Sequence, residues 1–228
     1  MIKGVIFDKD GTLFDFNATW GAWTRDMIAS EVGGDRVRMA QMADVLGYDL
    51  DAGLFNQGSI VIAETVDVVA SAMMPLLPDA DKAALIERMK EATKHVPQVE
   101  PVPLAPVLTQ LRGMGLRLGV ATNDAEAPAR ANLAHVTEQF EMIMGFDSGY
   151  GGKPAPGQLL AFCKQTGLAP SECIMVGDST HDLHAGRAAG MVCVGVLTGP
   201  APDWELAPLA DVVMPNIAGL PDWIAAQP

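Results

Sequence analysis

The sequence predicts an α/β protein in which a parallel sheet, covered by helices on both faces, is interrupted after its first strand by an all-helical insertion. Two observations lead to this prediction. Beyond about residue 100, short apolar runs alternate with helical segments, which is the order expected of parallel strands joined by crossover helices. Between about residues 17 and 95, apolar residues instead recur at helical spacing.

The composition is that of a globular protein and argues against several partners. The chain has 228 residues, of which 49% are hydrophobic and 19% charged, and its formal net charge is -13. Such an acidic protein is not expected to bind nucleic acid or an anionic membrane, because both select basic surfaces. Three cysteines in apolar surroundings, without a CxxC pair, indicate free thiols in a reducing compartment. The start of the chain is too short an apolar run for a signal peptide, so we expect a cytoplasmic protein.

The first strand and the limits of the insertion come from changes in pattern. Residues 4–7 form a β-rich run, Gly-Val-Ile-Phe, that leads directly into an acidic turn. The later end of the helical pattern is marked by a group of prolines, Pro97, Pro101, Pro103 and Pro106. We therefore expect a core domain made of residues 1–14 and 99–228, with a helical domain inserted at 15–98.

The helices of the insertion are predicted from apolar residues that lie three or four apart. The sets are Trp20, Trp23, Met27 and Ile28; Val37, Met39, Met42, Val45 and Leu46; and Ile62, Val66, Val69 and Met73. A last helix fits residues 81–94, with acidic residues near its start. Aromatic and methionine side chains at this spacing are more typical of a helical core than of a cofactor site.

The elements of the core after the prolines follow one another as helix and strand. The predicted strands cover residues 116–121, 142–145, 173–176, 192–197 and 211–214. The predicted helices cover residues 107–112, 125–139, 158–165 and 181–189, with a short terminal helix after the last strand. Glycine follows several of the helices, as is common at helix ends.

The end of the first predicted strand carries residues that can do chemistry. The strand leads into Asp8-Lys9-Asp10-Gly11-Thr12, in which Asp8 and Asp10 are two apart and can face one pocket. Two such carboxylates can bind a hard cation, or one can attack as a nucleophile while the other transfers protons. The alternative is an ordinary surface turn, because aspartate and glycine are common turn residues.

Three further segments also lie where predicted strands end or loops begin. Thr122 and Asn123 precede a helix whose first backbone amides suit an anion, although a plain helix cap is the alternative. Lys153, between glycines and a Pro-x-Pro segment, can act as a fixed positive charge or be ordinary solvated surface. Asp178 and Asp182 can complete a metal site, or merely cap a helix and complement its dipole.

Together and in this order, the four segments resemble the haloacid dehalogenase superfamily of phosphohydrolases. The matching positions are Asp8-x-Asp10-Gly11-Thr12, Thr122, Lys153 and Gly177-Asp178-Ser179-x-x-Asp182. The helical insertion looks like that family's helical cap, and its position and the chain length are similar to the phosphoglycolate phosphatase-like branch. The resemblance implies a Rossmann-like core, dependence on Mg²⁺ and an aspartyl-phosphate intermediate.

The resemblance also implies a role for each residue that would act on the substrate. Asp8 would be the nucleophile. Asp10 would protonate the leaving group and then activate water. Thr122 and Lys153, with Asn123 beside them, would bind the phosphoryl group. These roles agree with the physics of phosphoryl transfer, in which positioning and charge neutralisation do most of the work.

The metal site implied by the resemblance uses the same acidic residues. Mg²⁺ would be held by the carboxylates of Asp8 and Asp178 and by the backbone carbonyl of Asp10, with Asp182 supporting the site from behind these ligands. At least these four acids would then converge on one pocket. Such a pocket repels phosphate until a divalent cation fills it.

Several residues separate this chain from other branches of the superfamily. Asp10 is present, whereas true dehalogenases are expected to lack this second aspartate. Phosphonatases are expected to use a Schiff-base lysine of the cap, and nothing singles out Lys82, Lys90 or Lys94 for that role. Lys9 lies where an apolar residue is common in the superfamily. A cation there can tune the site or point to solvent, and we expect it to point to solvent.

Residues of the insertion are candidates to face the substrate. They are Phe16, Trp20, Trp23, Thr24 and the polar loop 56–59, with the core of the insertion or an ordinary loop as the alternative. The insertion carries no arginine cluster suited to a polyanion, which favours a small substrate with a single phosphate.

The leading hypothesis is Mg²⁺-dependent hydrolysis of a small-metabolite phosphate monoester, such as phosphoglycolate, by a monomer or homodimer. A β-phosphoglucomutase-like phosphosugar mutase is the first alternative, because it would keep all four segments. A non-catalytic binding protein of the same fold is the second, and the intact acidic residues and lysine argue against it.

Overall fold

The structure is a computed structural model that describes residues 1–56, 58–93 and 96–227. The chain forms two compact units, Met1–Asp15 with Glu100–Pro228, and Phe16–Val99. We call them the core unit and the inserted unit. The boundaries expected from the sequence lie one residue from these, and the role of the inserted unit as a cap over the site stays a prediction.

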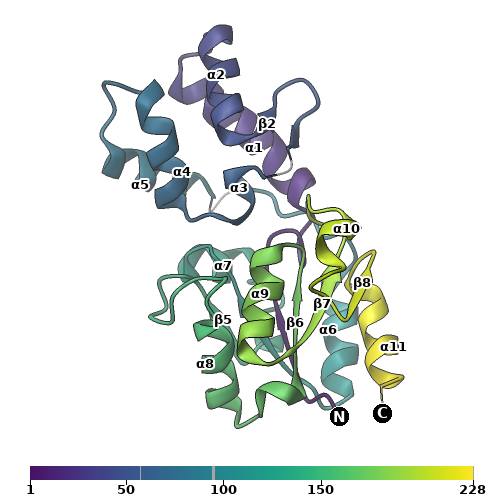
Figure 1. The fold of residues 1–228 in the computed structure, drawn as a ribbon. Helices are drawn as coiled ribbons and strands as arrows, with labels where there is room; N and C mark the ends of the chain where they lie inside the picture. The colour runs from purple at the N-terminus through teal and green to yellow at the C-terminus, as the bar shows by residue number, and fades with distance from the viewer. Residues whose placement is uncertain (57, 94–95, 228) are drawn as a thin grey trace. The chain divides into compact units, whose positions relative to one another are not determined.

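The core unit contains a parallel sheet of six strands in the order β5-β4-β1-β6-β7-β8, which confirms the predicted fold class (Figure 1). The strands are β1 (Gly4–Phe7), β4 (Arg117–Ala121), β5 (Met142–Met144), β6 (Cys173–Gly177), β7 (Val192–Val196) and β8 (Val212–Met214). Strand β1 pairs with β4 on one side and with β6 on the other. The carboxyl ends of these three strands therefore lie side by side.

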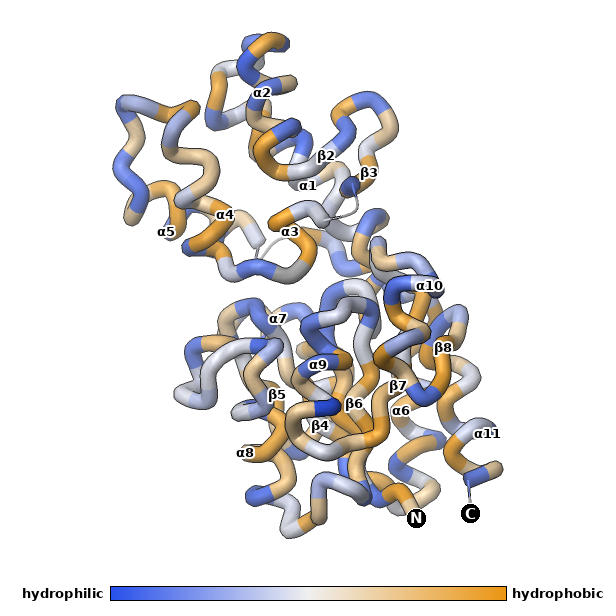
Figure 2. The backbone as a smooth tube through the Cα atoms, viewed as in Figure 1, coloured by the Kyte–Doolittle hydropathy of each residue, from blue (hydrophilic) through white to orange (hydrophobic). Residues whose placement is uncertain are grey.

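Helices cover both faces of this sheet because alternate residues of each strand point to opposite sides. The covering helices are α6 (Leu104–Gly113), α7 (Glu126–Asn132), α8 (Gly157–Thr166), α9 (Thr180–Ala189), α10 (Asp203–Leu206) and α11 (Leu220–Ala225). Val5 and Phe7 pack in one buried cluster with α6, α7 and α11, whereas Ile6 packs in another with α8 and α9. Figure 2 shows hydrophobic residues concentrated along these strands.

The inserted unit is helical apart from one short pair of strands. Its helices are α1 (Phe16–Glu31), α2 (Arg36–Leu46), α3 (Ile60–Ala63), α4 (Val66–Met73) and α5 (Lys82–Thr93), and a 3-10 turn follows α4 at Met74–Leu76. The core unit has further 3-10 turns at Thr137–Gln139, Pro170–Glu172 and Ile217–Gly219. Strands β2 (Tyr48–Asp49) and β3 (Leu54–Phe55) pair antiparallel. The all-helical prediction missed them because they are two residues long and too short to show an alternating pattern.

Local chemistry explains the two strands. Gly47 ends α2 in the left-handed conformation, with φ 66°, and turns the chain away from the helix. The Asp49 carboxylate then accepts hydrogen bonds from the backbone of Asp51 and Ala52, which forms a turn, and Gly53 completes the turn with φ 71°. Tyr48 and Phe55 are buried against each other across the pair.

The predicted helix at 125–139 is only partly correct. Helix α7 ends at Asn132, and a 3-10 turn follows at Thr137–Gln139. The hydroxyl of Thr137 donates to the carbonyl oxygen of Leu133 at 2.8 Å, which is the acceptor that a continuing helix would offer to the Thr137 amide. The β-branched Val136 and Thr137 also have low helix propensity.

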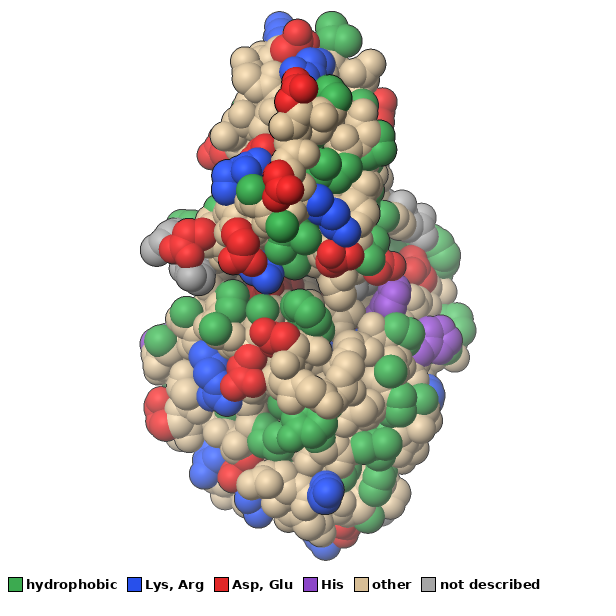
Figure 3. Space-filling view, turned by 90° about the vertical axis from the view of Figure 1, so that its left-hand side faces the viewer, with side chains coloured by type: hydrophobic (Ala, Val, Ile, Leu, Met, Phe, Trp, Pro, Cys, Tyr) green, Lys and Arg blue, Asp and Glu red, His purple; other side chains and the backbone are tan. Residues whose placement is uncertain are grey.

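The surface carries mixed charge. On the face drawn in Figure 3, acidic and basic side chains lie interspersed. Among the described residues, no helix is both long and apolar enough to cross a membrane.

Candidate active site

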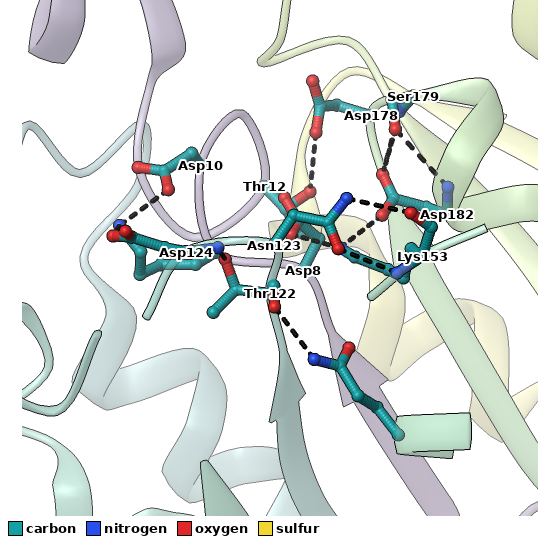
Figure 4. Close-up of polar contacts among 12 residues, drawn as sticks. Asp8, Asp10, Thr12, Thr122, Asn123, Asp124, Lys153, Asp178, Ser179 and Asp182 are labelled. Atoms are coloured by element: carbon teal, nitrogen blue, oxygen red, sulfur yellow. Dashed lines mark hydrogen bonds and ion pairs between the residues drawn. The ribbon is translucent and has the colours of Figure 1, made fainter. Parts of the chain in front are cut away.

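The candidate site lies where β1, β4 and β6 end. Phe7 pairs in register with Val120 of β4 and with Val176 of β6, so the residues that follow these strands are brought together. Asp8 continues the pairing, because its backbone amide donates to the Val176 carbonyl oxygen at 2.8 Å. The structure thus places three of the four predicted segments at one edge of the sheet, with Lys153 reaching in from a loop (Figure 4).

A cluster of buried charges forms the centre of this site. Carboxylate oxygens of Asp8, Asp178 and Asp182 lie within 4.8 Å of one another, and all three residues are buried. The Lys153 ammonium lies 2.5 Å from an oxygen of Asp8 and 2.5 Å from an oxygen of Asp182. We call these four residues the charge cluster. With every group ionised it carries three negative charges against one positive charge.

Burial, together with this excess of negative charge, shifts the pKa of Asp8 and of Asp178. Burial raises the pKa of Asp8 to about 7, with Lys153 opposing the shift and Asp182 adding to it. Burial, and then the charges of Asp182 and Asp8, also raise the pKa of Asp178 well above its usual value. Without a further cation, protons are therefore held on the cluster near neutral pH.

Lys153 responds in the opposite direction. Burial by itself lowers the pKa of a lysine, but the nearby charges of Asp182 and Asp8 outweigh it and raise the pKa of Lys153 above its ordinary value. The ammonium therefore stays charged over the physiological range. This places a fixed positive charge beside Asp8, as the sequence pattern predicted.

Asp182 is held by the start of α9. Its second carboxylate oxygen accepts hydrogen bonds from the backbone amide of Ser179 at 3.0 Å and from the Ser179 hydroxyl at 2.7 Å. The Ser179 hydroxyl in turn accepts from the Asp182 amide, which makes a capping box. Asp182 therefore takes part in the capping box and also belongs to the charge cluster. The residue that caps the helix is Ser179 and not Asp178, and the role of both aspartates in a metal site stays a prediction.

Glycines make room for the carboxylates, and the sequence did not indicate one of them, Gly199. A Cβ on Gly199 would lie 1.7 Å from an Asp178 oxygen, and one on Gly177 would lie 2.2 Å from the Asp182 Cβ. Gly11, with φ 86°, would bring a Cβ within 2.3 Å of Asp178. Gly177 belongs to a segment already indicated by the sequence, whereas Gly199 follows the end of β7 by three residues and lies outside every predicted segment.

The Thr122 segment is fixed by a residue that the sequence did not indicate. The fully buried Gln158 donates to the Thr122 carbonyl oxygen at 2.9 Å, which anchors the end of β4 to α8. Thr122 itself is buried, and its hydroxyl accepts from the Asp124 amide at 3.1 Å. The sequence signal that could have indicated Gln158 is that it is a polar residue among the apolar residues on the buried face of α8.

Asn123 contacts the lysine loop. Its amide oxygen accepts from the Lys153 backbone amide at 2.8 Å, and its amide nitrogen donates to the Lys153 carbonyl oxygen at 2.9 Å. These two bonds hold the backbone of Lys153 and thereby the base of its side chain. Direct contact of Asn123 with substrate stays a prediction.

The expectation that Lys9 points to solvent is wrong. Its side chain is fully buried, and its ammonium lies 2.6 Å from an oxygen of Asp10 and 3.5 Å from an oxygen of Asp124. Burial favours the neutral lysine, but the charges of Asp10 and Asp124 prevail and raise the pKa of Lys9 above its ordinary value. The carboxylates that surround the position make a buried cation more stable there than the pattern suggested.

The aromatic candidates of the inserted unit lie in its own core or pack against it. Phe16 packs edge-on against Phe55 with ring centroids 5.0 Å apart, and Trp20 packs likewise against Trp23 at 5.4 Å. Phe16 and Trp20 belong to the buried cluster of this unit, with Trp23 packed against it, and substrate contact for all three stays a prediction.

The other candidates of the insertion have local roles or lie outside the described residues. Thr24 is buried, and the Ser59 hydroxyl accepts from the Val61 amide and so caps α3. Gln57 of the polar loop lies outside the described residues, as does Lys94 at the end of the predicted last helix.

Comparison with known proteins agrees with this fold and site. The profile of the haloacid dehalogenase-like hydrolase family matches residues 5–196, and the chain belongs to that family. A fructose-1-phosphate phosphatase of Escherichia coli K12, YqaB, is 30% identical over 85% of this chain and 95% of its own length. A phosphoglycolate phosphatase of Yersinia pestis is 31% identical over 96% of this chain and 94% of its own. The chain is an enzyme of the family's phosphatase type.

Solved structures of other proteins have a similar fold. A structure described as a predicted phosphoglycolate phosphatase from Haemophilus somnus superposes with a TM-score of 0.74 at 19% identity, covering 98% of both chains. L-2-haloacid dehalogenase from Xanthobacter autotrophicus superposes with a TM-score of 0.67 at 20% identity over the whole of both chains. One fold therefore carries different chemistries, and the residues of the site determine which of them a given chain performs.

Because the pKa of Asp178 is raised, replacing this residue by a neutral one should change the thermal stability of the metal-free protein in a way that depends on pH. A carboxyl group whose pKa is raised by folding favours the folded state only while it is protonated, and this contribution is lost as the pH rises. Asp178→Asn removes the buried charge, so in EDTA we expect its melting temperature at pH 8 to exceed that of the unchanged protein by about 2–8 °C, at about 2–4 °C per kcal/mol.

Because the pKa of Asp178 is raised, less of its charge is present at pH 5, and the same substitution should raise the melting temperature less there than at pH 8. Differential scanning calorimetry at both pH values measures the effect, and Asp79→Asn in an exposed loop is the matched control. A destabilised Asp178→Asn at pH 8 would contradict the electrostatic description of the cluster.

Proposed function

We propose that this phosphatase hydrolyses the phosphate monoester of a small metabolite through an aspartyl-phosphate formed on Asp8, with Mg²⁺ as cofactor. The observation that supports it most is the charge cluster, in which three buried carboxylates face one lysine. A phosphoryl group needs a nucleophile, a fixed cation and a metal at one point, and the cluster offers residues for all three.

The donor set fits a divalent cation. Oxygen atoms are the ligands that Mg²⁺ prefers, and it binds to few carboxylates while keeping several waters. In our proposal the carboxylates of Asp8 and Asp178 and the backbone carbonyl of Asp10 hold the ion, and Asp182 supports them through Lys153 and α9. The bound ion would supply positive charge that offsets the repulsion between Asp8 and the phosphate.

The chain's own residues carry both steps. A carboxylate oxygen of Asp8 attacks phosphorus, the bond from phosphorus to the ester oxygen breaks, and Asp10 gives that oxygen its proton. Water then attacks the phosphorus of the aspartyl-phosphate and loses a proton to Asp10, the bond to the Asp8 oxygen breaks, and phosphate leaves. Lys153 and Thr122 bind the phosphoryl oxygens, with the Lys153 loop held by Asn123.

A small substrate with one phosphate agrees with the inserted unit and with the relatives. Several arginines of this unit have local partners: Arg88 pairs with Glu31, and Arg38 donates to the Leu76 carbonyl oxygen. Curated relatives are named for fructose-1-phosphate and for phosphoglycolate, and both are small monophosphates. We propose phosphoglycolate or a molecule of similar size, acted on in the cytoplasm, which accords with three buried free thiols.

Replacing the proposed nucleophile gives the first test. Asp8→Asn keeps the size of the side chain but removes the attacking carboxylate, so we expect phosphate release to fall by about 10³-fold or more. Phosphate release from phosphoglycolate and circular dichroism of the same samples check the result, with Asp79→Asn as the control. Near-normal turnover by a folded Asp8→Asn protein would overturn the nucleophile assignment.

Metal removal gives the second test. EDTA should stop phosphate release and added Mg²⁺ should restore it, because without the ion the negative charges of the cluster outnumber the one positive charge of Lys153 and repel phosphate. We would follow this in a screen of phosphorylated metabolites that also scores isomerisation of phosphosugars. Turnover that is unaffected by EDTA would contradict the proposed metal site, and isomerisation without phosphate release would favour a mutase.

A further inference from the structure

Lys9 is a buried cation whose partners come from three parts of the core unit. It lies between Asp8 and Asp10 in the turn after β1, and its side chain is fully buried. Its ammonium pairs with Asp10 at 2.6 Å and Asp124 at 3.5 Å, and it donates to the amide oxygen of Asn132 at 3.3 Å. It therefore connects the turn after β1 to the loop after β4 and to the end of α7.

Two of the three partners of Lys9, Asp124 and Asn132, belong to other parts of the core unit and are held by their own surroundings. The Asp124 carboxylate accepts from the Ala125 amide at 2.9 Å, and the Asp124 carbonyl oxygen accepts from the Phe146 amide at 3.0 Å. Asn132 is the last residue of α7. The ammonium is thus fixed from the interior by groups that do not belong to the charge cluster.

The backbone of Lys9 is fixed as well. Its carbonyl oxygen accepts hydrogen bonds from the amides of Leu13 at 3.0 Å and Phe14 at 3.1 Å, and both of these residues are fully buried. A lysine side chain is flexible in water, but here both of its ends are held. The position of its ammonium is therefore a property of the fold.

Asp10 differs from its partner in exposure. Its side chain keeps 16% of its surface accessible, whereas Lys9 keeps none. The carboxylate is thus anchored by a buried cation on the protein side while the residue remains reachable from solvent. This is the arrangement that a proton-transferring group needs, because a misplacement of about 1 Å in a catalytic group can cost on the order of 10²-fold in rate.

We propose that Lys9 is a positioning residue that holds the Asp10 carboxylate where it exchanges protons with the leaving group and with water. This inference rests on the proposed function, because it takes Asp10 as the acid and base of the two steps. Lys9 does not touch the substrate in this proposal. Its charge also interacts with Asp8, but less strongly than with Asp10 and Asp124. The positioning role that we propose acts through Asp10.

The effect of losing the Asp10 acid on the rate of the first step should depend on the leaving group. An alkoxide such as that from phosphoglycolate must receive a proton as it leaves, whereas p-nitrophenolate leaves as a stable anion without one. Loss of the acid therefore slows the first step only for the alkyl ester. Loss of the base slows hydrolysis of the aspartyl-phosphate for both esters.

Lys9→Met keeps the length of the side chain and removes the charge. We expect kcat/KM for phosphoglycolate to fall about 10- to 100-fold relative to kcat/KM for p-nitrophenyl phosphate, as part of the 10²–10⁴-fold that acid–base catalysis contributes. Rapid mixing with p-nitrophenyl phosphate should give a burst of p-nitrophenolate close to one per enzyme, followed by slow turnover. Lys3→Met, which breaks a surface ion pair with Glu172, is the matched control.

Lys9→Met leaves Asp124 buried without its cation, which can prevent folding. The double variant Lys9→Met/Asp124→Asn removes both charges and keeps Asp10, and it should have the same leaving-group dependence and the same burst. Equal losses for the two esters, or no loss, in a folded variant would overturn the positioning role and leave Lys9 a structural ion pair. If the protein without substitutions hydrolyses neither phosphoglycolate nor p-nitrophenyl phosphate, the proposed function is overturned, and this inference with it.

Discussion

The buried charge cluster is the constraint on which the rest of the site depends. Three carboxylates and one ammonium are buried together, and burial of an excess charge is unfavourable unless protons or a cation compensate it. Folding brings them together because apolar strands and helices stabilise the core unit enough to offset that cost. The cluster therefore stores electrostatic free energy that a bound divalent cation would release.

Register and space explain how the fold can hold such a cluster. Parallel pairing of β1 with β4 and β6 sets the ends of three strands side by side, so residues distant in sequence meet without long loops. Glycines at 11, 177 and 199 leave room for two carboxylates that a Cβ would displace. The start of α9 satisfies one oxygen of Asp182, which lets the other oxygen face Lys153.

The sequence alone was sufficient for the fold class and for the location of the charge cluster, because apolar strands that run into acidic or glycine-rich turns are local patterns. It was not sufficient for Lys9, whose burial depends on Asp124 and Asn132, more than 100 residues later in the chain. Gln158 was missed for the same reason, since its partner is the backbone of Thr122. The pair β2 and β3 and the early end of α7 depend on single side-chain hydrogen bonds, which periodicity does not register.

The coupling between protons and metal in the cluster can be measured directly. Asp8 has a pKa of about 7 and Asp178 a raised pKa when no metal is bound, so an ion that binds to both must displace protons. Isothermal titration calorimetry of the metal-free protein with Mg²⁺ at pH 7, repeated in buffers of different ionisation enthalpy, counts the protons released. Our account predicts release of roughly one proton per bound ion, whereas binding without proton release, or no binding, would contradict it.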